Sequence, residues 1–232
     1  MNRKGAVRNL DIVKAVIFDL DGIITDTAEY HYLAWREIAE ELGIKIDRTF
    51  NEQLKGVGRM DSLNRILTFG NKNLSVKEKD YYAAKKNERY KELIKGIGPT
   101  DLLPGIEGFL QEIRDVGLKI GLASASKNAF TVIESLKIGS YFDTIVDAAL
   151  VEKSKPDPEV FLRAAEQLQV PYSTCIGIED AEAGVIAIKE AGMFAVGIGL
   201  ESDLALADIV LPSTELLHLK QIIEIVEGSF GC

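Results

Sequence analysis

Two aspartates, Asp19 and Asp21, stand at the end of an apolar run in AVIFDLDGIITDT, residues 15–27. The run is typical of a buried strand, which would carry both carboxylates out of bulk water. Removing an unpaired carboxylate from water costs several kcal/mol, and two neighbouring ones also repel each other. The spacing therefore predicts that positive charge, from a metal ion or a lysine, lies beside this strand end.

Three other polar groups follow apolar runs later in the chain. They are SASKN at 124–128, KSKP at 153–156 and ED at 179–180. Ligands of parallel sheets bind beyond the carboxyl ends of the strands, so groups remote in sequence can meet there. Acids, lysines and serines gathered in one cleft are typical of a site for a metal ion and a phosphate.

The acids predict a magnesium site. Mg²⁺ prefers oxygen ligands in an octahedral shell that keeps some water and often includes a substrate phosphate. Asp19 and Asp180 are candidate ligands, with Glu179 as a further one and a backbone carbonyl near Asp21 as another.

The same edge could transfer a phosphoryl group. A carboxylate can attack phosphorus to form an aspartyl phosphate, and Asp19, last in the strand, is the better placed nucleophile. Asp21 can exchange a proton with the attacking or leaving oxygen. Lys155 can hold a phosphoryl oxygen as a point charge, and Ser124 offers a hydroxyl near a helix start.

Helical patterns fill residues 27 to about 100, without a convincing strand. Asp26 or Thr27 can cap the first helix, with Glu29 spaced for a capping box from Asp26. Ser75 and Glu78 have the same spacing at a later helix start. The predicted helices end at Gly43, Gly70 and Gly96.

Beyond residue 104 short apolar runs alternate with helical patterns, which indicates a parallel sheet covered on both faces. We predict an α/β fold: a doubly wound, Rossmann-like parallel sheet formed by 1–26 and 104–232, with 27–103 inserted as a helical cap. The strands are expected at about 14–19, 118–124, 144–149, 174–180, 194–199 and 207–212. The later helices are expected at 106–117, 129–139, 158–170, 182–192 and 213–228.

Composition narrows the class of protein. The 232 residues are 47% hydrophobic, and 27 Lys and Arg against 36 Asp and Glu give a net charge of −9. This argues against nucleic acid or a membrane surface as a partner. Cys175 and Cys232 suggest neither a disulfide framework nor a thiolate metal site, and no run approaches a membrane span. We expect a cytoplasmic protein, active as a monomer.

Four ordered motifs resemble those of the haloacid dehalogenase superfamily: FDLDGIITDT, SASKN, KSKPDP and GIEDAEAG. DLDGIITDTAEYH, FNEQLKGVGR, ASASKN and SKPDPEVF resemble the β-phosphoglucomutase family more closely, over nearly the whole chain including the cap. The chain departs from that family at Gly58, where serine is frequent, and by an amino-terminal extension.

This resemblance implies interconversion of β-D-glucose 1-phosphate and D-glucose 6-phosphate, with Mg²⁺ as cofactor and β-glucose 1,6-bisphosphate as intermediate and primer. It implies small-molecule sugar phosphates as the partners, Asp19 as the phosphorylated nucleophile and Asp21 as the general acid/base. Ser124 and Lys155 would balance charge on the transferring group. The implied metal ligands are Asp19, Asp21, Glu179 and Asp180. The implied substrate-binding residues are His31, Leu54, Lys55, Gly56, Val57, Arg59, Lys86, Ser124, Ala125, Ser126, Lys127 and Asn128.

Two other functions fit the same residues. A phosphatase of the superfamily would pass the phosphoryl group to water, and a phospho-accepting signalling module would present its aspartate to a partner. A cap favours transfer to sugar, because closure excludes water and completes the site around the correct substrate. We hypothesise that His31 and Lys86 couple closure to Asp21. Trp35 is expected in the cap core rather than as a platform for substrate.

Overall fold

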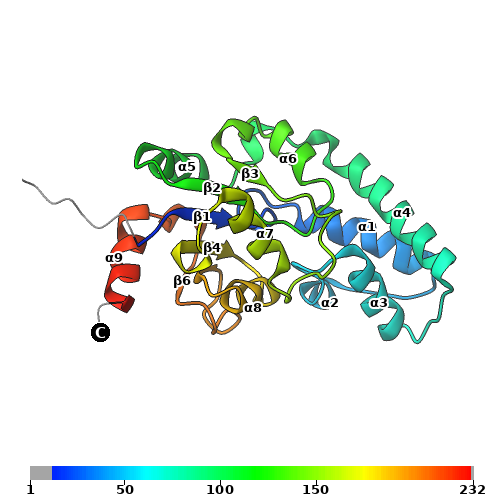
Figure 1. Cartoon of the computed structure of the whole chain (residues 1–232). Coiled ribbons are helices and arrows are strands. Elements are labelled where there is room, and N and C mark those ends of the chain that lie inside the picture. Colours follow the sequence, from blue (N-terminus) through cyan, green and yellow to red (C-terminus); the bar gives the residue numbers. More distant parts are fainter. Residues whose placement is uncertain (1–11, 231–232) are drawn as a thin grey trace, which may run out of the picture.

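A parallel six-stranded sheet and a projecting group of helices make up the computed structural model, which describes residues 12–230 (Figure 1). The strand order β3-β2-β1-β4-β5-β6 confirms the predicted fold class. The amino-terminal extension (1–11) and Cys232 lie outside these residues. The strands are β1 (Ala15–Phe18), β2 (Lys119–Leu122), β3 (Thr144–Ile145), β4 (Cys175–Glu179), β5 (Phe194–Ile198) and β6 (Ile209–Leu211).

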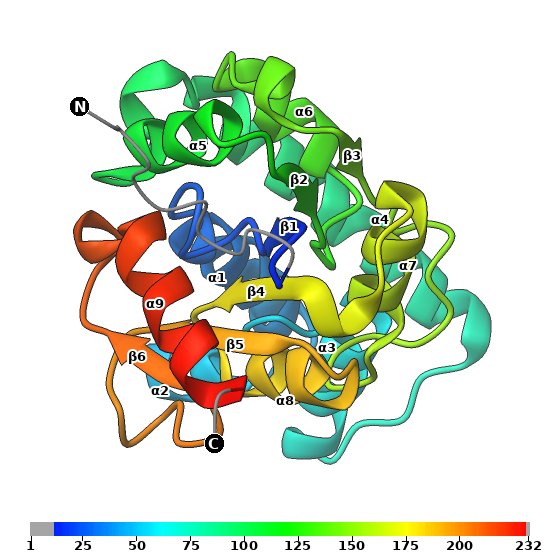
Figure 2. The ribbon, with the colours of Figure 1, turned by 60° about the vertical axis from the view of Figure 1, so that its left-hand side comes forward.

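Helices cover both faces of the sheet (Figure 2). Successive strand residues point to opposite faces, so Val16 and Phe18 pack with α5, α6 and α9, and Ile17 packs with α7 and α8. Two separate apolar cores result, one on each face, and they hold the central strands rigidly. These helices are α5 (Ile106–Asp115), α6 (Ala129–Ser135), α7 (Glu159–Leu168), α8 (Glu182–Glu190) and α9 (Leu219–Phe230).

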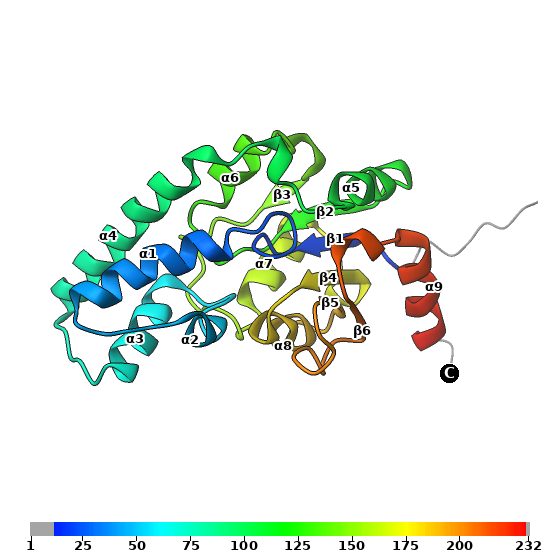
Figure 3. The ribbon, with the colours of Figure 1, turned by 180° about the vertical axis from the view of Figure 1, so that it is seen from behind.

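The helices α1 to α4, which follow β1, form the cap, and α1 and α4 run side by side along its length (Figure 3). The cap has its own apolar core, which includes Trp35 and Leu63. Its two connections to the sheet are paired: Thr25 bridges Leu102, and the Leu103 N–H donates to the Ile24 carbonyl at 3.0 Å. The boundaries at 26/27 and 103/104 stay predictions. The cap helices are α1 (Ala28–Glu41), α2 (Arg48–Glu52), α3 (Arg59–Phe69) and α4 (Val76–Leu93).

One of the two predicted capping boxes is present. At α4 the Ser75 N–H donates to Glu78 Oε2 at 2.7 Å and the Glu78 N–H donates to Ser75 Oγ at 3.4 Å. The box predicted from Asp26 to Glu29 is wrong. Asp26 Oδ1 instead accepts from the Ala28 N–H at 3.1 Å. Glu29 turns away to an ion pair with Arg48.

Several predicted elements are shorter in the structure. The helix predicted over 129–139 ends at Ser135, and the strand predicted over 207–212 spans only Ile209–Leu211. β3 ends at Ile145 because the chain turns at Asp147, whose carboxylate accepts from the Ala149 N–H at 2.8 Å. The helix predicted over 213–228 is broken. The Thr214 hydroxyl donates to the Pro104 carbonyl at 2.7 Å, and α9 begins only at Leu219. The 3-10 helices are η1 (Ile94–Gly96), η2 (Pro99–Asp101), η3 (Gly139–Tyr141), η4 (Tyr172–Thr174) and η5 (Thr214–Leu216).

Within residues 12–230 we find no helix whose length and hydropathy would let it span a bilayer.

Candidate active site

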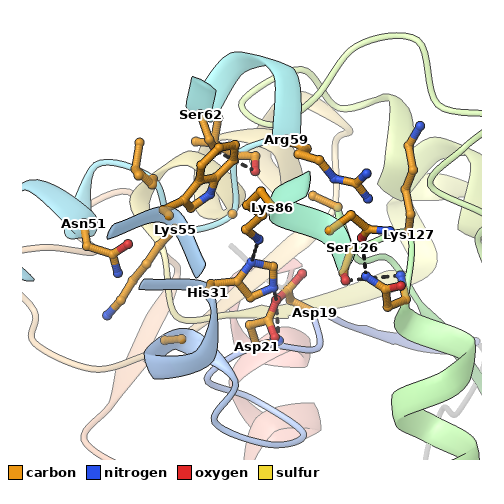
Figure 4. Close-up of a pocket in the computed structure, with 18 of the residues that line it drawn as sticks. Asp19, Asp21, His31, Asn51, Lys55, Arg59, Ser62, Lys86, Ser126 and Lys127 are labelled. Carbon is orange, nitrogen blue, oxygen red and sulfur yellow. Dashed lines mark hydrogen bonds and ion pairs between the residues drawn. The ribbon is translucent and has the colours of Figure 1, made fainter. Parts of the chain in front are cut away.

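The carboxyl edge of the sheet faces the cap, and the pocket between them receives residues from both (Figure 4). Asp19 follows β1, Glu179 ends β4 and Asp180 follows it. The structure therefore brings these groups together as the parallel-sheet argument predicted. The pocket is lined by Asp19, Asp21, Ala28, His31, Trp35, Asn51, Leu54, Lys55, Gly56, Val57, Arg59, Ser62, Lys86, Asn87, Ala125, Ser126, Lys127, Asn128 and Asp180.

A buried lysine joins two of the acids. Lys155 Nζ donates to Asp19 Oδ1 and to Glu179 Oε1, both at 2.6 Å, and all three residues are buried. Burial on its own would lower the pKa of Lys155, but the two carboxylates outweigh it and raise the pKa above its ordinary value. Lys155 is therefore the counter-charge that the strand-end aspartates require.

The remaining oxygens of these carboxylates are also ordered. Asp19 Oδ2 accepts from the Asp21 N–H at 3.0 Å. Glu179 Oε2 accepts from the Asp180 and Ala181 N–H groups at 2.8 and 2.9 Å. The backbone thus fixes the direction in which each carboxylate points before any substrate arrives.

Asp19, Glu179 and Asp180 can hold a cation. Each offers one carboxylate oxygen, and the three oxygens lie within 4.8 Å of one another. Burial, and then the charge of Glu179, raise the pKa of Asp180 well above its usual range, so this carboxylate lacks a full counter-charge. Hard oxygen donors with unbalanced negative charge fit Mg²⁺. The Asp21 carboxylate lies outside this group of three and is directed toward the cap.

Two glycines allow the acids to approach so closely. A Cβ at Gly22 would lie 2.2 Å from Asp180 Oδ2, and a Cβ at Gly184 would lie 1.8 Å from Glu179 Oε1. The carboxylates of Asp180 and Glu179 therefore occupy the space that a Cβ at Gly22 or Gly184 would take.

Asp21 faces a histidine and a lysine of the cap (Figure 4). His31 Nε2 lies 3.7 Å from Asp21 Oδ2, and His31 Nδ1 lies 2.6 Å from Lys86 Nζ. Burial, and then the charge of Asp19, raise the pKa of Asp21 to about 8. A carboxyl group with that pKa holds its proton near neutral pH and can act as a general acid.

The charges of the cap residues are set by the same burial. Burial, and then the neighbouring Arg59, lower the pKa of Lys86 to about 7. Burial, and then Lys86, lower the pKa of His31 well below its ordinary value, so the imidazole is neutral. A neutral ring that accepts from Lys86 at Nδ1 carries its proton on Nε2, the nitrogen that faces Asp21.

The loop after β2 supplies a row of polar groups. Ser124 Oγ accepts from the Ser126 N–H at 3.1 Å, and Ser126 Oγ accepts from the Asn128 N–H at 3.3 Å. Asn128 Nδ2 donates to Asn87 Oδ1 on α4 at 2.9 Å, which links this loop to the cap. Ser124 itself is buried and lines the neighbouring cavity together with Lys155.

The cap contributes a second loop, between α2 and α3. Leu54, Lys55, Gly56, Val57 and Arg59 all line the pocket, as the resemblance implied. Gly56 has a positive φ of 67°, which favours glycine. Lys55 Nζ forms an ion pair with Glu52 at 2.7 Å.

Several lining residues were not predicted from the sequence. Asn51, Ser62 and Asn87 face the pocket from α2, α3 and α4. Trp35 lies in the cap core, as expected, but also lines the pocket. The sequence offered a weak signal for two of them: Ser62 is one helical turn after Arg59, and Asn87 follows Lys86.

Residues 13–192 match the family model of haloacid dehalogenase-like hydrolases. The chain belongs to the haloacid dehalogenase-like hydrolase family. One relative, the β-phosphoglucomutase of Bacillus subtilis (strain 168), is 50% identical over 213 residues, which cover 89% of this chain and 94% of the relative. The β-phosphoglucomutase structure from Clostridium difficile superposes with a TM-score of 0.92 at 50% identity and covers 94% of this chain and 99% of that one. The sequence comparison and the structure comparison both confirm the resemblance that the motifs indicated.

A second haloacid dehalogenase-like relative has a different name. A putative phosphatase of Bacillus subtilis (strain 168) is 33% identical over 184 residues, which cover 78% of this chain and 81% of the relative. Relatives of this chain thus include one named as a mutase and one named as a putative phosphatase.

Proposed function

We propose that this chain is a β-phosphoglucomutase. It interconverts β-D-glucose 1-phosphate and D-glucose 6-phosphate through β-glucose 1,6-bisphosphate and an aspartyl phosphate on Asp19. The observation that carries the proposal is the placement of Asp21 between the acid cluster and the cap residues His31 and Lys86. The high identity to the Bacillus enzyme over nearly the whole chain supports the choice of sugar phosphate.

Asp19 is the nucleophile in this reaction. Its carboxylate is held by Lys155 and by the Asp21 N–H, so it attacks phosphorus along a fixed direction and forms an acyl phosphate. Asp21 gives its proton to the departing sugar oxygen and takes a proton from the next attacking hydroxyl. Lys155 and Ser124 stabilise the negative charge that spreads over the phosphoryl oxygens.

Asp19, Glu179, Asp180 and the backbone carbonyl of Asp21 would hold Mg²⁺. When bound, the ion would neutralise part of the charge on the carboxylates and on the phosphoryl group.

The cap and the loop after β2 hold the rest of the substrate. Arg59 binds the phosphate that is not transferred, because its planar guanidinium can donate two parallel hydrogen bonds. Ser126, Lys127 and Asn128 contact the same phosphate or the sugar. In this arrangement of cap and sheet, Asp19 is only 4% exposed, so water is largely kept from the acyl phosphate. That burial also disfavours a signalling module, which must present its aspartate to a partner.

The physiological partners in this proposal are small sugar phosphates, with neither nucleic acid nor membrane involved, and the active form is a cytoplasmic monomer. Size-exclusion chromatography coupled to light scattering tests the last point. A mass near 25.5 kDa is expected, and a dimer would contradict it.

The deciding experiment supplies β-glucose 1-phosphate, Mg²⁺ and a trace of β-glucose 1,6-bisphosphate, and measures glucose 6-phosphate and free phosphate. A mutase forms glucose 6-phosphate with little free phosphate. Asp19→Asn should abolish turnover, whereas Asp26→Asn, the same change at an exposed carboxylate, should retain it. Release of free phosphate as the main product would make the chain a phosphatase.

A further inference from the structure

Tyr90 on α4 contacts two members of the acid–base group without lining the pocket. Its ring centroid lies 4.1 Å from that of the His31 imidazole, with 37° between the ring planes. Lys86 Nζ lies 4.8 Å from the centroid of the same ring. An aromatic face attracts a cation at this distance, so one ring contacts both partners of the His31–Lys86 hydrogen bond.

The Tyr90 ring belongs to an apolar core that the sheet domain shares with the cap helix α1. Although α4 belongs to the cap, Tyr90 is fully buried and packs in the large apolar core beneath α5, α6 and α9, together with Ile94 and Ile97. The cap core proper contains His31's helix neighbours Tyr32 and Trp35 instead. Tyr90 is therefore a rigid surface against which the imidazole rests.

The contacts of Tyr90 with defined geometry are made by its ring and not by its hydroxyl group. Among the described residues its oxygen has no hydrogen-bond partner. Burial, and then the charge of Asp21, raise the pKa of the phenol, and the nearby hydroxyls of Thr27 and Ser126 act in the opposite direction. Since an unpaired buried hydroxyl is unfavourable, the aromatic ring is the part whose contacts are favourable.

We propose that Tyr90 is a positioning residue whose ring holds His31 in the orientation that directs Nε2 toward Asp21 and Nδ1 toward Lys86. Packing on one face of the imidazole restricts its rotation, and the attraction between the ring and Lys86 keeps the donor at Nδ1. This role rests on the proposed mutase function, because it matters for catalysis only if Asp21 exchanges protons with the sugar.

The first test measures His31 directly and does not depend on activity. The chain has two histidines. The ¹⁵N spectra of the imidazoles therefore contain the signals of His31 in the site and, as a reference, those of the exposed His218. In the wild type His31 should show a single tautomer with the proton on Nε2. Tyr90→Leu should average the two tautomers, and Tyr90→Phe, which keeps the ring, should retain one. A fixed tautomer in Tyr90→Leu would overturn the proposal.

The second test measures the mutase reaction. Tyr90→Leu should lower kcat about tenfold, less than the roughly 10²-fold that a 1 Å misplacement can cost, with little change in KM and a smaller ratio of transfer to sugar over transfer to water. Tyr90→Phe should stay within about threefold of the wild type. Loss of kcat in Tyr90→Phe with His31 still fixed would assign the effect to the hydroxyl and overturn the proposal.

Tyr82→Leu is the matched control for lost packing on α4. Tyr82 is partly buried against the cap core and contacts Tyr81 at 5.2 Å between centroids. It should leave the His31 spectrum and the transfer ratio unchanged. If the wild type has no mutase activity, the proposed function fails, but the spectra still decide whether Tyr90 holds His31.

Discussion

The site has two halves that differ in how completely their polar atoms are paired. In the half built on the sheet, Lys155, Asp19 and Glu179 are buried and hydrogen-bonded to one another or to the backbone. Asp180, the third acid of the cluster that could hold a cation, still lacks a full counter-charge there. In the half shared with the cap, several buried atoms have no partner among residues 12–230. They are Asp21 Oδ1, Thr27 Oγ1, His31 Nε2 and Tyr90 Oη.

This difference indicates different tasks. Paired charges on a rigid sheet give a fixed electrostatic environment for the phosphoryl group, whichever position the cap takes. Unpaired polar atoms are costly, so the half at the cap gains most when a substrate hydroxyl or a small closing movement supplies the missing partner. We therefore infer that, in the proposed function, the sheet half serves phosphoryl transfer in general and the cap half selects sugar over water.

Lys155→Met should give the largest effect, because it removes the counter-charge of the sheet half. Breaking a buried ion pair from one side costs about 3–5 kcal/mol, and loss of one charge stabiliser lowers kcat by roughly 10²–10³-fold. Transfer to sugar and to water should fall together. Chemical denaturation in EDTA gives the first quantity, and assays of both products give the second.

Lys153→Met controls for the loss of a lysine from the same loop. Its ammonium group is exposed and lies 3.5 Å from Asp157, and exposed ion pairs contribute little. Equal stability of the two variants would mean that the sheet half does not depend on Lys155.

His31→Ala should have a smaller and more selective effect. It removes the group between Lys86 and Asp21, so transfer to sugar should fall by about 10²-fold, the lower end for acid–base groups, while transfer to water falls less. Rapid-quench measurement of both products from the phosphorylated protein checks this. His218→Ala, at an exposed histidine near Glu112, should change neither rate. Equal losses in both products would remove the distinction between the halves.

The sheet half could be predicted from the sequence and much of the cap half could not. Asp19 and Glu179 each end a short apolar run, and parallel strands bring such ends to one edge. The strand ends meet at this edge whatever conformation the connecting loops adopt. The predicted bounds were wrong where Asp147 shortens β3, where α6 ends at Ser135 and where Thr214 interrupts the last helix.

The cap half depends on how α1 and α4 pack, which periodicity does not fix. His31 and Lys86 are 55 residues apart and meet at 2.6 Å; the family resemblance named both, but residue spacing did not pair them. In the sequence nothing distinguishes Tyr90 from the other partly apolar positions of α4. Its contact with His31 depends on which face of α4 packs against α1, and only the structure shows this.

Gly58→Ala should give the smallest effect and tests closure itself. Gly58 has φ −59° and ψ 152°, which alanine adopts readily. A Cβ there would lie 2.8 Å from the Ser154 Cβ across the boundary between cap and sheet, and Ser154 also donates to Asp61 at the start of α3. Alanine therefore opposes the close approach of cap and sheet seen in this structure. We expect kcat/KM for sugar to fall by up to about tenfold, with the free energy of unfolding within about 0.5 kcal/mol of the wild type.

Two further variants separate closure from a general effect of the methyl group. Gly96→Ala adds a Cβ that meets nothing within 4 Å and should leave kcat/KM unchanged. Combining Gly58→Ala with Ser154→Gly removes the opposing Cβ, so activity should recover to that of Ser154→Gly alone. If kcat/KM of the double variant equals the value expected when the effects of the two single variants are independent, the contact between residues 58 and 154 does not limit closure. Selection of sugar would then rest on His31 and Lys86 alone.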